Sequence, residues 1–320
     1  MRAMILAAGL GARMQPLSAL RPKPVLPVVG IPLVAWPLAW LARHGVREVV
    51  LNLHHLPHAT RAAAEAWTPP GLAVRFSEEP DLLDTGGGIR RAAPFLRESD
   101  PSIVISGDMI CDFDLSALVA RHRARGDRLT LALRDDPRGD RFGTIGLDSE
   151  GRMRRIARRF DLGGEIEAGV NVSVYVFARR AFDSLPARRV FNHLDDWVAP
   201  ELASGAQDLR GERFSGETLL WEPVGTPSEY LAVNLELPTV SYFDAPCRAR
   251  ALGVRIEPGL VIGAGAKLEP GVRLRRAVVW NDELVPEGLH AEGGVFAGGR
   301  FHRCESEGER TTPRRVRNAP

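Results

Sequence analysis

One stretch near the N-terminus decides the fold: Leu6-Ala7-Ala8-Gly9-Leu10-Gly11-Ala12-Arg13-Met14-Gln15-Pro16-Leu17, followed shortly by Arg21-Pro22-Lys23-Pro24. Continuous apolar character over residues 4–8 predicts a buried strand that runs directly into a Gly-x-Gly turn. Glycines carry no side chain, so backbone N–H groups in such a turn can approach phosphate oxygens. Arg13 stands at the far side of the turn, where its guanidinium could make a bidentate phosphate contact. The stretch therefore predicts a phosphate-binding loop.

The lysine in this stretch is unusual for the chain. Of the 42 basic residues only Lys23 and Lys267 are lysine, and Pro22 and Pro24 stiffen the backbone on both sides of Lys23. Neither lysine follows a glycine, which excludes a Walker-type loop, and neither lies in the Val-Ala-Ile-Lys context of a protein kinase. A dinucleotide fingerprint is a further alternative, but Met14 occupies the position of its third glycine.

The first half of the chain alternates between two kinds of apolar pattern. Short apolar runs predict strands and helical periodicity predicts helices, which favours an α/β fold with a mainly parallel sheet between helices. Strands are predicted at residues 4–8, 48–53, 73–77, 102–106 and 129–134, and helices at 31–44, 58–67, 89–96 and 115–125. Loops that follow parallel strands share one edge of the sheet, where ligands bind.

The second half of the chain is richer in strand patterns. Strands are predicted at 144–147, 170–177 and 217–221, a helix at 227–235, and a linker over 238–250. Apolar residues then recur every six positions at Ile256, Ile262, Leu268, Leu274 and Trp280. This period predicts a hexapeptide β-helix, and an ordinary β-meander is the alternative. The arginine- and glutamate-rich residues 300–320 show no periodicity and are predicted to be disordered.

Several motifs of this sequence together resemble those of a known family. The string Gly9-x-Gly11-x-Arg13-x-x-Pro16 with Pro22-Lys23-Pro24 resembles the signature of the nucleotide-sugar pyrophosphorylases, the sugar-1-phosphate nucleotidylyltransferases. Leu83–Ile89, Ser106-Gly107-Asp108 and Val224-Gly225-Thr226-Pro227 look like further motifs of that family. The string Asn52-Leu53-His54-His55-Leu56 is most similar to the branch of mannose-1-phosphate guanylyltransferases and N-acetylmuramate-1-phosphate uridylyltransferases.

The resemblance implies both a domain plan and a reaction. It implies a Rossmann-like three-layer nucleotidyltransferase domain over residues 1–240, a linker over 241–250, a left-handed hexapeptide β-helix over 251–299 and a tail over 300–320. A nucleoside triphosphate, GTP or UTP, would react with a sugar-1-phosphate in the presence of Mg²⁺, by in-line attack on the α-phosphorus, giving a nucleotide sugar and pyrophosphate. Such chemistry depends on positioning and charge neutralisation rather than on an acid–base pair.

The same resemblance implies the roles of individual residues. Arg13, Lys23 and Asp108 would be catalytic, with Asp108 also the metal ligand, and Asn171 would bind the sugar. The implied nucleotide-binding residues are Ala8, Gly9, Gly11, Ala12, Asp84, Gly86 and Gly87.

Three positions depart from the family pattern. Pro223 stands where the family carries a second metal-binding aspartate, Arg158-Arg159 replaces a Glu-Lys pair, and Ser173 replaces a glycine after Asn171. Two hypotheses follow: a working enzyme with one strong metal ligand, or a catalytically weakened regulatory subunit or sensor that binds nucleotide sugars.

Other features are interpreted structurally or limit the function. Asp112-Phe113-Asp114 mimics a metal-binding Asp-x-Asp motif, but Asp114 suits the N-cap of the helix that follows. His54, His55 and His58 lack the companion ligands of a zinc site. A net charge of +2 disfavours nucleic-acid binding, no apolar run would span a membrane, and three distant cysteines suit a cytoplasmic protein. A homo-oligomer formed through the C-terminal segment is a further expectation.

Overall fold

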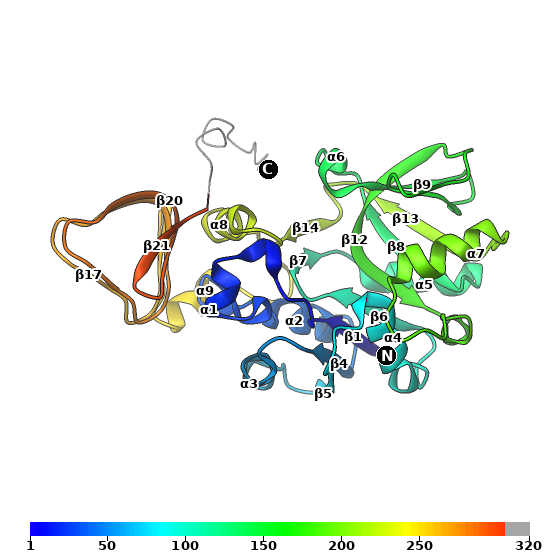
Figure 1. The fold of residues 1–320 in the computed structure, drawn as a ribbon, viewed down its shortest axis with the longest axis horizontal. Helices are drawn as coiled ribbons and strands as arrows, with labels where there is room; N and C mark the ends of the chain where they lie inside the picture. The colour runs from blue at the N-terminus through cyan, green and yellow to red at the C-terminus, as the bar shows by residue number, and fades with distance from the viewer. Residues whose placement is uncertain (305–320) are drawn as a thin grey trace.

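A ten-stranded mixed sheet forms the centre of the larger part of the molecule (Figure 1). The computed structural model describes residues 1–304. The strands follow the order β11–β10–β9–β12–β6–β1–β4–β5, with β8 also paired to β12 and β13 paired to β8. They are β1 (Arg2–Leu6), β4 (Glu48–Leu53), β5 (Ala73–Glu78), β6 (Ser102–Ser106), β8 (Leu129–Arg134), β9 (Thr144–Leu147), β10 (Met153–Ile156), β11 (Phe160–Asp161), β12 (Glu167–Phe177) and β13 (Leu209–Phe214).

Strands β6, β1, β4 and β5 are parallel, as the alternation of strands and helices predicts. The chain builds outward from β1 to β4 and β5, and then returns to place β6 on the other side of β1. Such a reversal leaves a crevice at the carboxyl ends of β1 and β6, because the connections leave these two strands in opposite directions. Gly9 and Gly11 follow β1 and Asp108 follows β6, so this topology brings the predicted phosphate loop and metal ligand together.

Helices cover both faces of the sheet, which confirms the three-layer α/β class. Successive strand residues point to opposite faces, so Met4 and Ile5 belong to different buried clusters. The Ile5 face packs against α2, α3 and α5, and the Met4 face against α4 and α7. These helices are α2 (Ala35–Arg43), α3 (Pro57–Trp67), α4 (Asp84–Leu96), α5 (Leu115–Arg125) and α7 (Ala199–Ala203). The Asp114 side chain accepts a hydrogen bond from the Ala117 backbone N–H (3.0 Å), which confirms the predicted N-cap.

Several predicted boundaries were wrong. The start of the helix predicted over 31–44 is a short hairpin, β2 (Pro27–Val28) with β3 (Ile31–Pro32), because Val29 and Gly30 make a turn with positive φ. Helix α4 begins at Asp84, before the three glycines rather than after them. Strand β13 was not predicted, and β14 (Leu220–Pro223), paired with β7 (Met109–Asp112), replaces the strand expected at 217–221.

The remaining short elements connect the layers and flank the crevice. They are η1 (Ala12–Met14), α1 (Leu17–Leu20), η2 (Lys23–Val25), α6 (Gly139–Phe142), η3 (Arg179–Asp183), η4 (Leu194–Val198) and α8 (Pro227–Leu235). Thr226 caps α8 by accepting a hydrogen bond from the Glu229 backbone N–H. No helix of residues 1–304 has the length and apolar character needed to cross a membrane.

The C-terminal part is a stack of short strands with a triangular outline (Figure 1). Leu260 pairs with Ala277 and Ala277 with Gly294, all in parallel, so equivalent positions are 17 residues apart. This pairing is consistent with the predicted β-helix, and its left hand stays a prediction. The strands are β15 (Arg255–Glu257), β16 (Leu260–Ile262), β17 (Lys267–Leu268), β18 (Arg273–Val279), β19 (Leu284–Val285), β20 (His290–Ala297) and β21 (Arg300–Arg303).

The strict six-residue register was wrong at both of its ends. Ile262 is in register with Val279 rather than with Trp280, because each coil takes 17 residues and not 18. Trp280 consequently leaves the interior of the stack and packs with Tyr230 in the core shared with the larger domain, whereas Ile256 is exposed.

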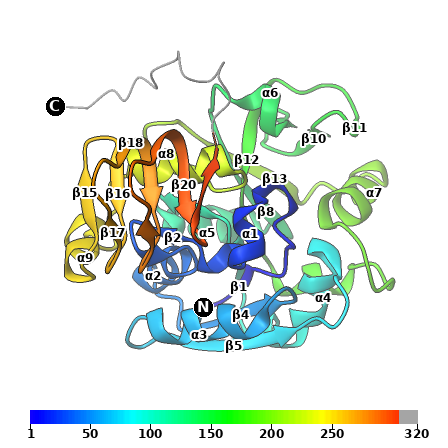
Figure 2. The same cartoon turned by 60° about the vertical axis from the view of Figure 1, so that its left-hand side comes forward.

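The edges of this segment also differ from the prediction. The expected linker contains helix α9 (Ala245–Ala251), capped by Asp244, whose side chain accepts a hydrogen bond from the Cys247 backbone N–H. Residues 300–303 of the predicted disordered tail form β21 on the edge of β20. The remainder of that tail, residues 305–320, lies outside the described residues. Figure 2 shows β18 and β20 beside α8, so the stack of C-terminal strands packs directly on the larger domain.

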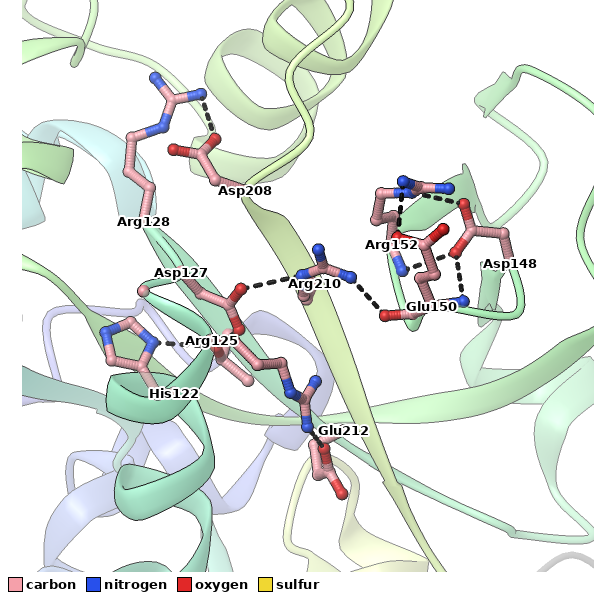
Figure 3. Close-up of polar contacts among 12 residues, drawn as sticks. His122, Arg125, Asp127, Arg128, Asp148, Glu150, Arg152, Asp208, Arg210 and Glu212 are labelled. Carbon is pink, nitrogen blue, oxygen red and sulfur yellow. Dashed lines mark hydrogen bonds and ion pairs between the residues drawn. The ribbon is translucent and has the colours of Figure 1, made fainter.

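Buried histidines make the stability of this fold depend on pH. Thr130 Oγ1 donates to Asp127 (3.0 Å) and therefore accepts from Nδ1 of His122 (2.9 Å), beside the Asp127–Arg210 ion pair (Figure 3). His193 is buried as well, and burial lowers the pKa of both histidines to about 4. Between pH 6.5 and 4 the unfolded chain thus takes up protons that the folded protein does not.

The free energy of unfolding should fall by about 2 kcal/mol for each of His122 and His193 between pH 7 and pH 5. Urea unfolding at both pH values tests this. His122→Asn should remove about half of the fall, because asparagine keeps a donor for Thr130 and does not titrate. An equal slope in His122→Asn would contradict the expectation.

Candidate active site

A cavity of about 590 Å³ opens at the carboxyl ends of β1 and β6. Its wall comes from the loops after β1, β5 and β6 and from Asn52 near the end of β4, together with the Lys23 segment and Gly225. Eight of the predicted site residues line it: Ala8, Gly9, Gly11, Ala12, Arg13, Lys23, Asp84 and Asp108. The sequence missed three polar side chains in the same wall, Asn52, Glu79 and Thr85. Asn52 and Thr85 lie within strings that resemble family motifs, whereas nothing in the sequence pointed to Glu79.

One end of the cavity wall holds an ion pair between Lys23 and Asp108. Nζ of Lys23 lies 2.5 Å from Oδ2 of Asp108, while Oδ1 of the same carboxylate accepts a hydrogen bond from the Ser106 hydroxyl. The Lys23 side chain is 11% exposed and that of Asp108 is 37% exposed. Burial opposes ionisation of Asp108, but the Lys23 charge and the hydrogen bonds from Lys23 and Ser106 outweigh it and hold its pKa below the usual value. Asp108 is therefore an anion at neutral pH.

The phosphate loop has the conformation that its glycines allow. Gly11 adopts φ +66°, and an added Cβ would lie 3.1 Å from Cβ of Ser18, whose hydroxyl donates to the Gly11 carbonyl (2.8 Å). Gly9 has open space where its side chain would be. Within residues 1–304, Arg13 makes no hydrogen bond or ion pair with the protein, although its positive charge helps to lower the Asp108 pKa. Its guanidinium is available to an anionic ligand.

The opposite end of the cavity is formed at β4 and β5. The buried Asn52 accepts a hydrogen bond from the Ala7 backbone N–H (2.7 Å) and donates to Glu79 (2.9 Å). A Cβ on Gly88 would lie 2.9 Å from both Asn52 Nδ2 and Glu79 Oε1, so a glycine is needed there. Three strand spacings separate β6 from β5, roughly 14 Å. The cavity thus extends from a cationic end near Lys23 to an acidic end at Glu79.

Gly86 and Gly87 lie behind this cavity wall rather than in it. Their backbone N–H groups donate to the Phe191 carbonyl (2.9 and 3.2 Å), and a Cβ on Gly86 would collide with the Phe191 ring. The structure therefore uses these glycines to seat the segment around Phe191 against α4, and it places Val190 from that segment in the cavity wall. Thr85, at the same helix start, lines the cavity and contacts His193 (2.8 Å).

Asn171 also lies outside the cavity lining. Its side chain donates to the Tyr175 hydroxyl (3.0 Å) and accepts from the Ser173 backbone N–H (2.9 Å). The pairing of β12 with β8 is irregular between Asn171 and Tyr175, and Ser173 there adopts φ +58°. This serine thus occupies a left-handed conformation that favours glycine.

The strain at Ser173 predicts an unusual order of stability. Ser173→Gly should be about 1 kcal/mol more stable than Ser173→Ala, because a residue with a Cβ is strained at this φ. Elsewhere in strands glycine is the less stable of the two. Thermal unfolding of both variants measures the difference. An alanine variant as stable as the glycine variant would show that the left-handed conformation is not strained.

The structure also shows where the other residues that depart from the family pattern lie and what they contact. Pro223 pairs with Met109, next to Asp108, so no side chain there can bind a metal. Glu222 pairs with Ile110 and its carboxylate lies 3.4 Å from Arg138, which shows that the strand has not slipped to present it. Arg159 pairs with Asp195. Among residues 1–304 no group of three histidine, cysteine, aspartate or glutamate side chains could hold a metal.

The family model described as Nucleotidyl transferase matches residues 2–239, nearly three quarters of the sequence. This chain belongs to the nucleotidyl transferase family. The match begins before the phosphate loop and ends just after α8, so it covers the whole cavity and excludes the β-helix.

Curated relatives agree with the family. The mannose-1-phosphate guanylyltransferase of Mycobacterium tuberculosis is 29% identical over 305 residues, which are 91% of this chain and 82% of the relative. The N-acetylmuramate alpha-1-phosphate uridylyltransferase of Neisseria meningitidis is 32% identical over 234 residues, 71% of this chain and 94% of the relative. The protein is accordingly a nucleotidyltransferase enzyme of the nucleotide-sugar pyrophosphorylase group, as the sequence motifs predict.

Solved structures share the fold. HddC from Yersinia pseudotuberculosis complexed with GMP-PN has a TM-score of 0.60 at 20% identity, covering 74% of this chain and 99% of that one. A putative glucose-1-phosphate thymidylyltransferase from Bacillus anthracis has a TM-score of 0.62 at 16% identity, covering 77% and 98%. At these identities the likeness concerns the fold alone.

Proposed function

We propose that this enzyme joins a nucleoside triphosphate, GTP or UTP, to a sugar-1-phosphate and releases pyrophosphate. The observation that carries the proposal is the Lys23–Asp108 ion pair at one end of the cavity, beside the open phosphate loop and Arg13, which forms no ion pair within residues 1–304. Phosphates fit this charged end. The nucleobase then fits the end formed at β4 and β5, where Leu82 and Val190 supply apolar surface.

The reaction needs no proton transfer by the protein. An oxygen of the sugar phosphate attacks the α-phosphorus, a new P–O bond forms, and the bond from the α-phosphorus to the bridging oxygen breaks to release pyrophosphate. Both reactants are anionic, so the protein must position them and neutralise their charge. Lys23 provides a compact charge for the reacting phosphates, and Arg13 a planar fork for the departing pyrophosphate.

The donor set fits a magnesium ion that arrives with the triphosphate. Mg²⁺ commonly takes one or two carboxylates and completes its shell with phosphate oxygens and water. Asp108 is the carboxylate that would hold it, since it is ionised and remains partly exposed in the cavity. When bound, the ion would neutralise phosphate charge. The protein's own part is to keep the Asp108 carboxylate charged and oriented, through Ser106 and Lys23.

The assay that tests the proposal is pyrophosphate release over a matrix of nucleoside triphosphates and sugar-1-phosphates with Mg²⁺. We expect turnover with GTP or UTP and one class of sugar phosphate. Binding of a finished nucleotide sugar without pyrophosphate release from any pair would instead identify a sensor, a role that the names of the relatives do not favour. All three cysteines are free thiols, which supports the proposed cytoplasmic location.

Pro223→Asp should restore a second carboxylate beside Asp108. Residue 223 pairs with Met109, and the Val224 backbone N–H donates to the Asp108 carbonyl (2.8 Å), so this strand position adjoins the proposed metal ligand. The Mg²⁺ concentration for half-maximal activity should fall by about tenfold. Pro223→Asn is the matched control without charge. Equal Mg²⁺ dependence in both variants would rule out a missing ligand as the limit.

A further inference from the structure

The segment that carries Lys23 is short, lies along the cavity wall and makes few backbone hydrogen bonds of its own. Lys23 begins the 3-10 helix η2, whose backbone bonds are Val25 N–H to the Pro22 carbonyl and Leu26 N–H to the Lys23 carbonyl. The Val34 N–H adds a bond to the Pro24 carbonyl. Besides the Lys23–Asp108 ion pair and the contact of η2 with α3, the position of this segment depends on what holds its two flanks.

One residue of the β-helix reaches both of these flanks. Trp280 follows β18, is 2% exposed, and its Nε1 donates to the Tyr230 hydroxyl at 3.0 Å. The Tyr230 hydroxyl in turn donates to the carbonyl of Pro27 at 2.6 Å, on the C-terminal side of Lys23. The donor count is consistent, because the tyrosine hydroxyl has one proton to give and accepts the indole N–H. Burial raises the Tyr230 pKa, so the hydroxyl keeps that proton.

The other flank is held by a cation–π contact. The Arg21 guanidinium lies over the Trp280 ring, 4.7 Å from its centroid, two residues before Lys23. Within residues 1–304 no carboxylate forms an ion pair with Arg21, so the indole face is its charge-stabilising contact. The face of the Trp280 indole therefore contacts Arg21, before Lys23. Its N–H is linked through the Tyr230 hydroxyl to the Pro27 carbonyl, after Lys23.

A role in joining the two parts of the molecule would explain why Trp280 is buried. It would not explain why the indole contacts Arg21 and, through Tyr230, the Pro27 carbonyl. Other contacts bring the β-helix to the same region: Val254 packs on Gly30 of the β2–β3 hairpin, and Gly298 lies against Leu20 just before Arg21. The C-terminal segment thus contacts the residues around Lys23 in addition to α8, against which β18 and β20 pack.

We propose that Trp280 is a positioning residue for Lys23, so that the β-helix sets the geometry of the active site. The inference rests on the proposed role of Lys23 in phosphoryl chemistry. The claim that Trp280 restrains the Lys23 segment does not depend on that role. Removing the indole should let the Lys23 segment move while the phosphate loop and nucleobase end stay in place. Small displacements of catalytic groups cost up to about 100-fold in rate.

The near absence of lysine gives a direct test, because Lys23 and Lys267 are the two lysines of the chain. The full-length protein without nucleotide is treated with an amine-acylating reagent. Peptide mass spectrometry then measures the rate of Lys23 acylation relative to that of the exposed Lys267. The variants are Trp280→Ala, Trp280→Phe and Leu202→Ala. The last is a control that lowers stability through a buried residue of α7, far from the Lys23 segment in the sequence and in another core cluster.

In Trp280→Ala, we expect Lys23 acylation to become at least about tenfold faster with Lys267 unchanged. In the pyrophosphate assay kcat should fall by about 10- to 100-fold while KM for the triphosphate stays within about threefold. Trp280→Phe keeps a ring for Arg21 but loses the N–H, so its values should be intermediate. Leu202→Ala should match the parent in both measurements at a temperature where it is folded.

Parent rates of Lys23 acylation and parent kcat in folded Trp280→Ala would overturn the proposal. Should Trp280→Ala fail to fold, Trp280→Phe decides alone: faster Lys23 acylation supports positioning, and the parent rate refutes it. A parent protein without turnover on any substrate pair would refute the proposed function, while the acylation rates would still decide whether Trp280 holds Lys23.

Discussion

Replacing Asp108 by asparagine should lower turnover by at least about 1000-fold, since the proposed metal would lose its carboxylate ligand and several kcal/mol of charge stabilisation. The change also leaves Lys23 without its 2.5 Å partner, so the lysine would no longer be oriented. Nucleotide affinity should fall only modestly, because the loop of Gly9 to Arg13 and the distant nucleobase end are untouched. Initial rates of pyrophosphate release and calorimetric titration with the triphosphate measure the two effects.

The matched control for this variant is Asp114→Asn. It removes the same charge six residues away, and asparagine is as good an N-cap as aspartate, so α5 keeps its start. Turnover in this control should equal that of the parent. Asp108→Asn turnover within tenfold of the parent would mean that Asp108 does not act on the reacting phosphates.

Lys23→Ala should lower turnover by at least about 100-fold, the effect of removing one preorganised charge from a transition state. The Asp108 carboxylate would remain partly solvated, so the melting temperature should change little. Lys23→Arg should recover only part of the activity, because a planar guanidinium does not replace a compact ammonium beside a carboxylate. The measurement is kcat at saturating triphosphate and sugar phosphate.

Lys267→Ala provides the control, since it removes the other lysine from an exposed position on β17. Its turnover should equal that of the parent. Near-normal turnover in Lys23→Ala would remove this lysine from the mechanism and, with it, the basis of the positioning role of Trp280. The acylation experiment would still report whether the indole restrains the Lys23 segment.

Much of the first domain could be predicted from the sequence because its signals are local. Buried parallel strands such as β4 and β6 are continuous apolar runs, and Asp114 marks a helix start by its own side-chain chemistry. The phosphate loop was recognisable for the same reason, since its glycines, Arg13 and Lys23 lie within one short stretch. The placement of Asp108 followed from the rule that ligands bind at the carboxyl ends of parallel strands.

Sequence patterns are least informative where a distant segment determines the local structure. The nucleotide-binding role of Gly86 and Gly87 stays a prediction, and their N–H groups donate to the Phe191 carbonyl, about a hundred residues away. The six-residue period was overextended, since Trp280 fits it in the sequence while the 17-residue coil turns this side chain toward Tyr230. Neither contact leaves a mark in the residues next to it.

The sequence by itself therefore determined the α/β class, the glycine-rich loop after β1 and the chemical identity of the charged groups, because each depends on neighbouring residues or on strand periodicity. Only the tertiary structure decided that Lys23 meets Asp108, that Asn52 and Glu79 form the far end of the cavity, and that Trp280 contacts both flanks of the Lys23 segment. These are contacts between residues 27 to 259 positions apart, and the packing of separate elements creates them.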